Sequence, residues 1–434
     1  MNILNRRHFL QAAGAAGVLA AIPRAVSAQT TSPRVVVVGG GFGGATVAKY
    51  LRLWAGNVQV TLVEPNATYI ACVLSNLVLT NAISLTRISL GYSSLQTNHG
   101  VSVLQGRAVA IDPPGNRLTV QTDSGMQDLE YDHLVLSPGI DFRPAPGNWN
   151  PELTPHAWEA GTQTTLLRNQ VASMRNNDRC VITVPRAPYR CPPGPYERAC
   201  VIADNLRTRG RTGAKVILLD ANAGIQAEVE AFTHAFNVTL RDWIEYVPNA
   251  QVTSVDSTTR SIVTTARTEN NARVLNYIPN QRAAPIAAGL GTDAAGFVPI
   301  NPLAYATLAF PSIHVIGDSA SVPATDGRGI AKSAHMANSE AKVCADAILR
   351  TLSGDNPDEN IATNSACYSP VTQRTASWFS TSFVYGDVFT AGGEVKGKGM
   401  DRIDVGEAPA DRVNNDTFTE MFTWADSLFA DSFA

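Results

Sequence analysis

The chain has 434 residues, a formal net charge of −3 at pH 7, 44% hydrophobic residues and 16% charged residues. This composition excludes disordered and fibrous classes, and the length allows two or three domains. Beyond the N-terminus, no Lys/Arg cluster indicates nucleic-acid binding, and no apolar run is long enough to cross a bilayer.

Residues 1–28 are predicted to be an export signal. Arg6 and Arg7 form a twin-arginine pair, and the weakly apolar stretch 12–22 that follows is too short to span a membrane. Val26-Ser27-Ala28 has the small residues of a cleavage site. The alternative is a free amphipathic tail. We expect periplasmic export by the twin-arginine route, which carries proteins already folded around their cofactor.

The next segment predicts a nucleotide-binding loop. A valine-rich strand is expected at residues 34–38, and residues 45–54 have helical periodicity. Between them lies Gly39-Gly40-Gly41-Phe42-Gly43-Gly44, in which Gly39, Gly41 and Gly44 have the G-x-G-x-x-G spacing. The first glycine permits a tight turn, the second lets the backbone approach a pyrophosphate, and the third lets helix and strand pack closely.

Glu64 strengthens this prediction. It follows a second expected strand, 58–63, about 20 residues after the loop, where a carboxylate accepts hydrogen bonds from ribose hydroxyls. A plain glycine-rich turn would not account for it. The predicted dinucleotide-binding residues here are Gly39, Gly41, Phe42, Gly43, Gly44 and Glu64.

Two later segments indicate that the dinucleotide is FAD. Residues 131–139 resemble the strand and turn that close the FAD half of flavoproteins with two dinucleotide-binding domains. Residues 313–318 resemble the second FAD motif of that superfamily, in which Asp318 would meet the ribityl chain or the pyrophosphate. A Gly-Asp pair after a strand is common in turns, so the prediction depends on the order and spacing of all three segments.

A second dinucleotide-binding fold is expected between these segments, without its glycine loop. Strands are predicted at 179–184 and 215–220, and the loop after the first contains Pro192, Pro193 and Pro195 where a pyrophosphate requires glycine. We therefore expect an electron donor other than a nicotinamide, which disfavours an NADH-dependent disulfide reductase.

The predicted fold class is α/β, with two Rossmann-like domains, the second degenerate and inserted into the first, and a C-terminal α+β domain. The expected boundaries are 29–150 and 273–354 for the FAD-binding domain, 151–272 for the inserted domain and 355–434 for a C-terminal interface domain. In the C-terminal domain, a helix is expected to have one apolar face and one acidic face, which disfavours binding to an anionic membrane surface. The apolar face comprises Phe418, Met421, Phe422, Trp424 and Leu428.

Several runs resemble one family. Residues 189–198 (YRCPPGPYER) resemble the flavoprotein subunit of flavocytochrome c sulfide dehydrogenase, as do 71–76, 156–158, 278–283 and 367–369. The resemblance implies FAD, sulfide as substrate, and electron transfer to a separate c-type cytochrome subunit. The chain has no Cys-x-x-Cys-His motif for a haem of its own.

The resemblance also implies roles for single residues. Cys72 matches the cysteine that bonds covalently to FAD, and Cys191 and Cys367 match a redox-active disulfide that hydrosulfide attacks. The alternatives are a small buried residue for Cys72 and a structural disulfide for the pair. Glu197 would exchange protons with sulfur species, and Lys332 would stabilise negative charge on the reduced flavin. A surface carboxylate and a solvent-facing lysine are the alternatives for these two.

The other cysteines have no counterpart in the family. Six cysteines permit about 15 pairings, and Cys200 could compete for a partner. Cys180 and Cys344 have apolar surroundings and are expected to be buried free thiols. No close-spaced Cys/His set indicates a metal site.

Two other functions remain open. A sulfide:quinone oxidoreductase would share the fold and the sulfur chemistry but reduce a membrane quinone. An accessory flavoprotein of a periplasmic sulfur-oxidation system would stimulate its partners without turning over sulfide itself.

Overall fold

The computed structural model describes residues 32–325, 329–389 and 395–434. The predicted export signal, residues 1–28, lies outside these ranges. Residues Pro33–Ala434 form one compact unit. No helix in the described ranges is both long enough and apolar enough to span a bilayer.

The first lobe is built on an eight-stranded sheet with the strand order β23-β20-β21-β22-β9-β1-β2-β5. The valine-rich β1 pairs in parallel with β2 and β9, so its side chains are buried on both faces, as is typical of inner parallel strands. The strands are β1 (Arg34–Val38), β2 (Gln59–Glu64), β5 (Ser102–Gln105), β9 (His133–Leu136), β20 (Val298–Asn301), β21 (Ala306–Thr307), β22 (Ile313–Val315) and β23 (Ala320–Ser321).

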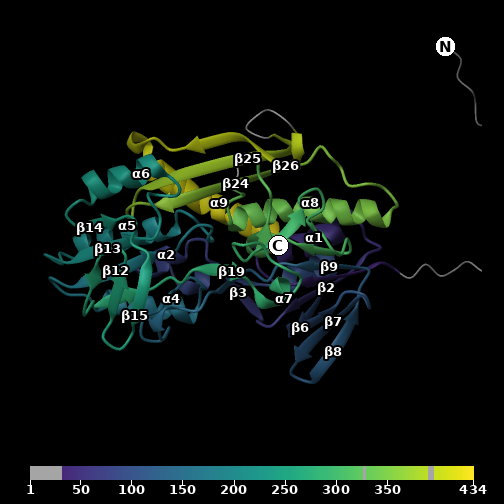
Figure 1. The fold of residues 1–434 in the computed structure, drawn as a ribbon, viewed down its shortest axis with the longest axis horizontal. Helices are drawn as coiled ribbons and strands as arrows, with labels where there is room; N and C mark the ends of the chain where they lie inside the picture. Colours follow the sequence, from purple (N-terminus) through teal and green to yellow (C-terminus); the bar gives the residue numbers. More distant parts are fainter. Residues whose placement is uncertain (1–31, 326–328, 390–394) are drawn as a thin grey trace, which may run out of the picture. The chain divides into compact units, whose positions relative to one another are not determined.

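Two long helices of this lobe pack against each other. Helix α1 (Phe42–Trp54) begins inside the glycine loop, three residues before the predicted start, and α8 (Ala334–Leu352) lies beside it (Figure 1). Smaller elements complete the lobe: β3 (Thr68–Ile70), α2 (Ser75–Val78), η1 (Leu85–Ile88), β4 (Ser89–Gly91), α3 (Ser93–His99), α7 (Pro285–Ala288), η3 (Gly317–Ser319) and an antiparallel meander of β6 (Arg107–Asp112), β7 (Arg117–Thr122) and β8 (Gly125–Glu130).

The second lobe has a parallel sheet of its own, in the order β14-β13-β12-β18. Its elements are α4 (Thr162–Ala172), β12 (Arg179–Val184), α5 (Gly194–Thr208), β13 (Lys215–Asp220), α6 (Val229–His234), η2 (Ala235–Thr239), β14 (Ile244–Val247) and β18 (Val274–Asn276). A second sheet contains β11 (Gly147–Asn148), β15 (Val252–Asp256), β16 (Ser261–Thr264) and β17 (Thr268–Glu269). The α/β class with two Rossmann-like folds is confirmed.

The chain passes between the lobes where β10 (Ile140–Phe142) pairs antiparallel with β19 (Gln281–Ala283). Because β18 is still a strand of the second sheet, the return to the first lobe falls a few residues after the expected boundary at residue 272. Likewise β11, in a sheet of the second lobe, begins before the expected boundary at residue 150.

The C-terminal part is an antiparallel sheet with a helix. It contains β24 (Ala362–Pro370), β25 (Ala376–Phe389), β26 (Val395–Glu407), η4 (Ala410–Arg412) and α9 (Asn415–Phe433). The apolar face of α9 includes Met421 and Leu428, both buried as expected, and its C-terminal end places Phe433 against Phe42 of α1. The core of the first lobe therefore includes the end of the chain.

Candidate active site

One cavity of about 890 Å³ is lined by residues of both lobes and of β24. It brings together the predicted site residues Gly39, Gly41, Phe42, Gly43, Glu64, Cys72, Cys191, Glu197, Asp318 and Cys367. Gly44 and Lys332 do not line it. Residues distant in sequence therefore share one enclosure large enough for a cofactor.

The glycine loop forms one end of the cavity. Gly39 has a φ of +94°, and a Cβ there would lie 2.4 Å from the carbonyl oxygen of Ser137. Gly44 packs the helix onto the turn, because a Cβ would lie 1.8 Å from the Gly39 oxygen, which explains why it is set back from the cavity. At the helix start Gly41 provides no side-chain cap, so the first backbone N–H groups of α1 and its positive dipole end suit a pyrophosphate.

The carboxylate of Glu64 lies at the edge of this loop and is largely buried. Its Oε2 accepts a hydrogen bond of 2.8 Å from the Gly40 backbone N–H, and its Oε1 accepts from Asn66. Glu64 therefore shapes the loop in addition to lying where a ribose is predicted.

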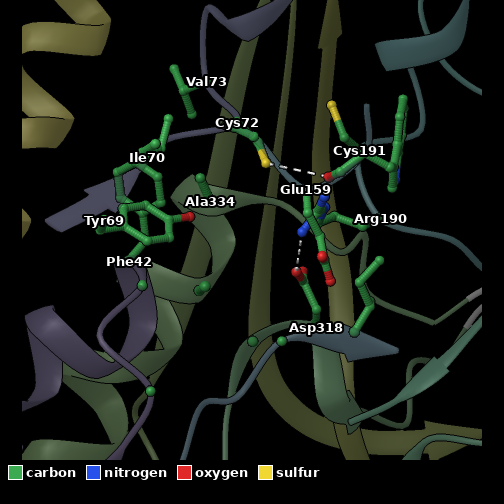
Figure 2. A pocket seen from close by; sticks show the side chains of 18 of the residues that line it. Phe42, Tyr69, Ile70, Cys72, Val73, Glu159, Arg190, Cys191, Asp318 and Ala334 are labelled. Carbon is green, nitrogen blue, oxygen red and sulfur yellow. Dashed lines mark hydrogen bonds and ion pairs between the residues drawn. The ribbon is translucent and has the colours of Figure 1, made fainter. Parts of the chain in front are cut away.

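Cys72 lies between β3 and α2, with its thiol 3.5 Å from the Trp158 carbonyl oxygen. Figure 2 shows Arg190 between Cys72 and Asp318, and the guanidinium forms an ion pair with Asp318 at 3.8 Å. Burial raises the pKa of Asp318, whereas Arg190 and Lys332 lower it. Asp318 thus keeps a cationic partner at the position predicted to meet the ribityl chain.

Cys191 is held by its backbone. It has a left-handed φ of 56°, and its N–H donates to the Lys332 carbonyl oxygen at 2.7 Å. A Cβ on Gly194 would come within 3.1 Å of the Cys191 sulfur, so this glycine leaves room for the thiol. Burial, and then the neighbouring Cys367 and Glu197, raise the pKa of Cys191 well above its usual value.

Cys367 lines the same cavity from β24. Burial raises its pKa to about 12, although Ser365 and Ser333 hydrogen-bond to it and lower the value. All six cysteines are free thiols in the structure, so the Cys191–Cys367 pairing stays a prediction. The expectation of buried free thiols at Cys180 and Cys344 is confirmed, and Cys200 is also fully buried.

Glu197 is buried in the first turn of α5, so the alternative of a surface carboxylate is wrong. Burial raises its pKa to about 8, against the lowering effect of a hydrogen bond from Asn76 Nδ2 at 3.0 Å. A carboxyl group with this pKa exchanges protons near neutral pH, as a general acid or base requires.

Comparisons with known proteins now bear on the identity of the chain. Residues 164–279 match the family described as sulfide dehydrogenase (flavocytochrome c) flavoprotein chain, central, and residues 33–181 match pyridine nucleotide-disulphide oxidoreductase. The sulfide dehydrogenase (flavocytochrome c) flavoprotein chain of Chlorobaculum thiosulfatiphilum is 60% identical over 45 residues, which are 10% of this chain and 94% of that sequence. The chain belongs to the flavocytochrome c sulfide dehydrogenase flavoprotein family.

Other relatives match at lower identity and over smaller shares of their own length. Ferroptosis suppressor protein 1 of Taeniopygia guttata is 39% identical over 119 residues. These residues are 27% of this chain and 30% of that protein. Mitochondrial sulfide:quinone oxidoreductase of Mus musculus is 22% identical over 67% of this chain, which spans 66% of it. Among solved structures, sulfide:quinone oxidoreductase of Aquifex aeolicus has a TM-score of 0.70 at 17% identity, covering 92% of each chain, and thus shares the fold.

In this member of the flavocytochrome c family, the Lys332 side chain does not line the main cavity, and its role beside the reduced flavin stays a prediction. Its ammonium donates to the Ala320 carbonyl oxygen and lies 3.9 Å from the centre of the Phe297 ring. The expected helix start beside it is correct, because Ser333 accepts from the Met336 N–H as the N-cap of α8. The solvent-facing alternative is wrong, since Lys332 is buried.

In the second lobe, the carboxylate at the strand end that corresponds to Glu64 is hydrogen-bonded by the protein's own side chains. Asp220 ends β13 as Glu64 ends β2, but it is fully buried and accepts hydrogen bonds of 2.8 Å from the hydroxyls of Tyr196 and Tyr246. Its other oxygen accepts from Asn222. A ribose would have to displace these partners, which agrees with the predicted loss of the glycine loop.

Sequence reasoning missed three polar residues of the site: Asn76, Arg190 and Arg198. The Arg198 guanidinium is fully buried; its Nη1 donates to the His156 carbonyl, and its Nε donates to Asn76 Oδ1 at 2.9 Å. All three residues lie in the runs that carry the family resemblance, and this was the one signal that could have found them.

Proposed function

We propose that the protein is a FAD-dependent sulfide dehydrogenase that oxidises sulfide to sulfur or polysulfide and passes the electrons to a c-type cytochrome. One observation carries the proposal: Cys191 and Cys367 line the same cavity as the glycine loop. A disulfide between them would form part of the wall around the cofactor.

The residues present fit FAD. The Gly39–Gly43 turn and the start of α1 would hold the pyrophosphate, Glu64 the ribose and Asp318 the ribityl chain. We propose that Cys72, which lines the cavity, forms a covalent bond to FAD. When bound, FAD takes up an electron pair from sulfur and releases single electrons to a haem.

The disulfide supplies the site of attack. Hydrosulfide attacks one cysteine sulfur, so that a new S–S bond forms, the Cys191–Cys367 bond breaks, and a persulfide and a thiolate result. The high pKa of both cysteines then favours protonation of the thiolate. Glu197, which exchanges its proton near neutral pH, is suited to supply that proton.

The twin-arginine signal supports a periplasmic location, and the family resemblance supports a separate cytochrome subunit. One observation favours the sulfide:quinone alternative: Val395, Ile403 and Val405 on β26 are exposed apolar side chains, as a membrane-facing surface would require. The two acceptors are distinguishable by experiment.

The mature protein is mixed anaerobically with sulfide and either a c-type cytochrome or a short-chain quinone, and flavin bleaching and acceptor reduction are recorded. We expect bleaching and haem reduction, both lost in Cys191→Ser and Cys367→Ser and retained in Cys344→Ala, a buried thiol outside the cavity. Reduction of the quinone alone would favour the alternative. Absence of bleaching in the wild type would contradict an enzyme and favour the accessory role.

A further inference from the structure

Glu228 is a fully buried carboxyl group to which the proposed chemistry assigns no role. It precedes α6 with a left-handed φ of 54°. Its Oε1 accepts a hydrogen bond of 2.7 Å from the Ser369 hydroxyl, and its Oε2 has no hydrogen-bond partner among the described residues. A buried carboxyl oxygen without a partner is unfavourable, so its retention calls for an explanation.

Ser369 connects this carboxyl to the redox cysteines. Ser365, Cys367 and Ser369 alternate along β24 and therefore point to the same face of the strand. Cys367 and Ser369 both line the main cavity. Ser369 thus lines the cavity, and its hydroxyl donates to Glu228.

Glu228 also lies near the protein surface, because the next two residues of the chain, Val229 and Glu230, are exposed. The half-buried Glu407 at the end of β26 is close enough that its charge raises the pKa of Glu228. Glu407 accepts a 3.0 Å hydrogen bond from the backbone N–H of Glu230, an exposed residue. Glu228 therefore lies between the sulfur site and solvent.

We propose that Glu228 relays protons between the redox cysteines and solvent, through Ser369 on the cavity side and Glu407 on the outer side. The inference rests on the proposed function, which creates the need for it. If a second hydrosulfide takes the sulfur from the persulfide, two HS⁻ become one HSS⁻, two electrons and one proton. The electron pair leaves the cysteines as the disulfide re-forms. Over a complete turnover, once the electrons have passed to the acceptor, one proton per HSS⁻ has to leave the buried site.

The electrostatics of the cluster agree with this role. The titratable groups that face Glu228 are Glu197 and Cys200 of α5, Cys367 of β24 and Glu407 of β26. Burial raises the pKa of Glu228 to about 7, while Ser369 and Ser377 lower it. The Ser377 hydroxyl lowers the pKa of Glu228 from nearby, although the two side chains do not form a hydrogen bond of normal geometry. Glu228 can thus accept and release a proton near neutral pH.

The test compares Glu228→Gln, which keeps the shape and an acceptor for Ser369, with Glu230→Gln, an exposed glutamate two residues away. Flavin reduction by sulfide is followed by stopped flow across pH 6 to 9, and a parallel series uses dithiothreitol as the reductant. The ratio of wild-type to variant rate at each pH cancels the titration of the reductant itself. Flavin content and thermal unfolding report any structural damage.

We expect Glu228→Gln to slow flavin reduction by on the order of 100-fold at pH 8. The effect should shrink below pH 7, because the wild-type carboxyl is then protonated and cannot accept a proton. Ser369→Ala should give the same loss, and the double variant should be no slower than either single variant. Ser369→Thr, which restores the hydroxyl, should recover part of the rate.

Equal rates and pH profiles in Glu228→Gln and Glu230→Gln would overturn the relay while leaving the proposed function intact. A double variant whose rate loss equals the product of the two single losses would also overturn the relay, because Glu228→Gln and Ser369→Ala would then act independently and not on one proton path. A wild type reduced by dithiothreitol but not by sulfide would contradict the proposed function. In that case, the dithiothreitol series would by itself test the relay, through the comparison of Glu228→Gln with Glu230→Gln.

Discussion

Asn76→Ala is expected to change both the stability of the protein and the pH dependence of its chemistry. Asn76 Nδ2 donates to Glu197 Oε1 and to the Gly194 carbonyl, and its Oδ1 accepts from Arg198 Nε, all within buried surroundings. Loss of the bond to the charged guanidinium costs about 2 kcal/mol, and loss of each of the bonds to the Gly194 carbonyl and to Glu197, protonated at neutral pH, costs about 1 kcal/mol. The unfolding free energy should fall by about 4 kcal/mol.

The pH effect follows from the same contact. The Asn76 hydrogen bond lowers the pKa of Glu197, so its removal should raise that pKa above the present value of about 8. The limb of the flavin-reduction profile that requires protonated Glu197 should move to higher pH. Denaturant unfolding and stopped-flow rates measure the two effects, with the exposed Asn98→Ala as the control. An unfolding free energy and pH profile like those of Asn98→Ala would refute the reasoning.

Two further predictions concern the cofactor. Gly39→Ala would place a methyl group 2.4 Å from the Ser137 oxygen at a φ of +94°. The absorption spectrum of the purified variant should therefore show little bound flavin. A flavin content equal to that of the wild type would contradict the assigned turn. In the wild type, acid precipitation should leave the yellow colour in the pellet, whereas Cys72→Ala should release it to the supernatant. Release from both proteins would show that Cys72 is not the attachment site.

The main structural features of the first lobe were predictable because they are local. A valine-rich strand, a glycine turn and a carboxylate at the next strand end are adjacent in the chain, and each restricts the backbone or the packing next to it. The prolines after β12 likewise excluded a second pyrophosphate loop without any knowledge of distant contacts. Such signals predicted the fold class and the glycine-loop end of the cavity.

The direction and burial of polar side chains could not be predicted, because they depend on elements far away in the chain. Lys332 follows the Asp318 motif closely, yet its ammonium lies against Ala320 and Phe297, and its backbone carbonyl holds Cys191. Only the packing of α5 against α2 buries Glu197 and supplies the Asn76 hydrogen bond.

The sequence by itself determined that the first lobe carries a glycine turn suited to a dinucleotide and that prolines stand at the matching turn of the second lobe, since both follow from the residues of one short segment. Tertiary structure decided that Cys72, Cys191 and Cys367 line one cavity and that Glu228 lies behind it. These residues lie on separate elements, and their proximity depends on how strands and helices from three parts of the chain pack together.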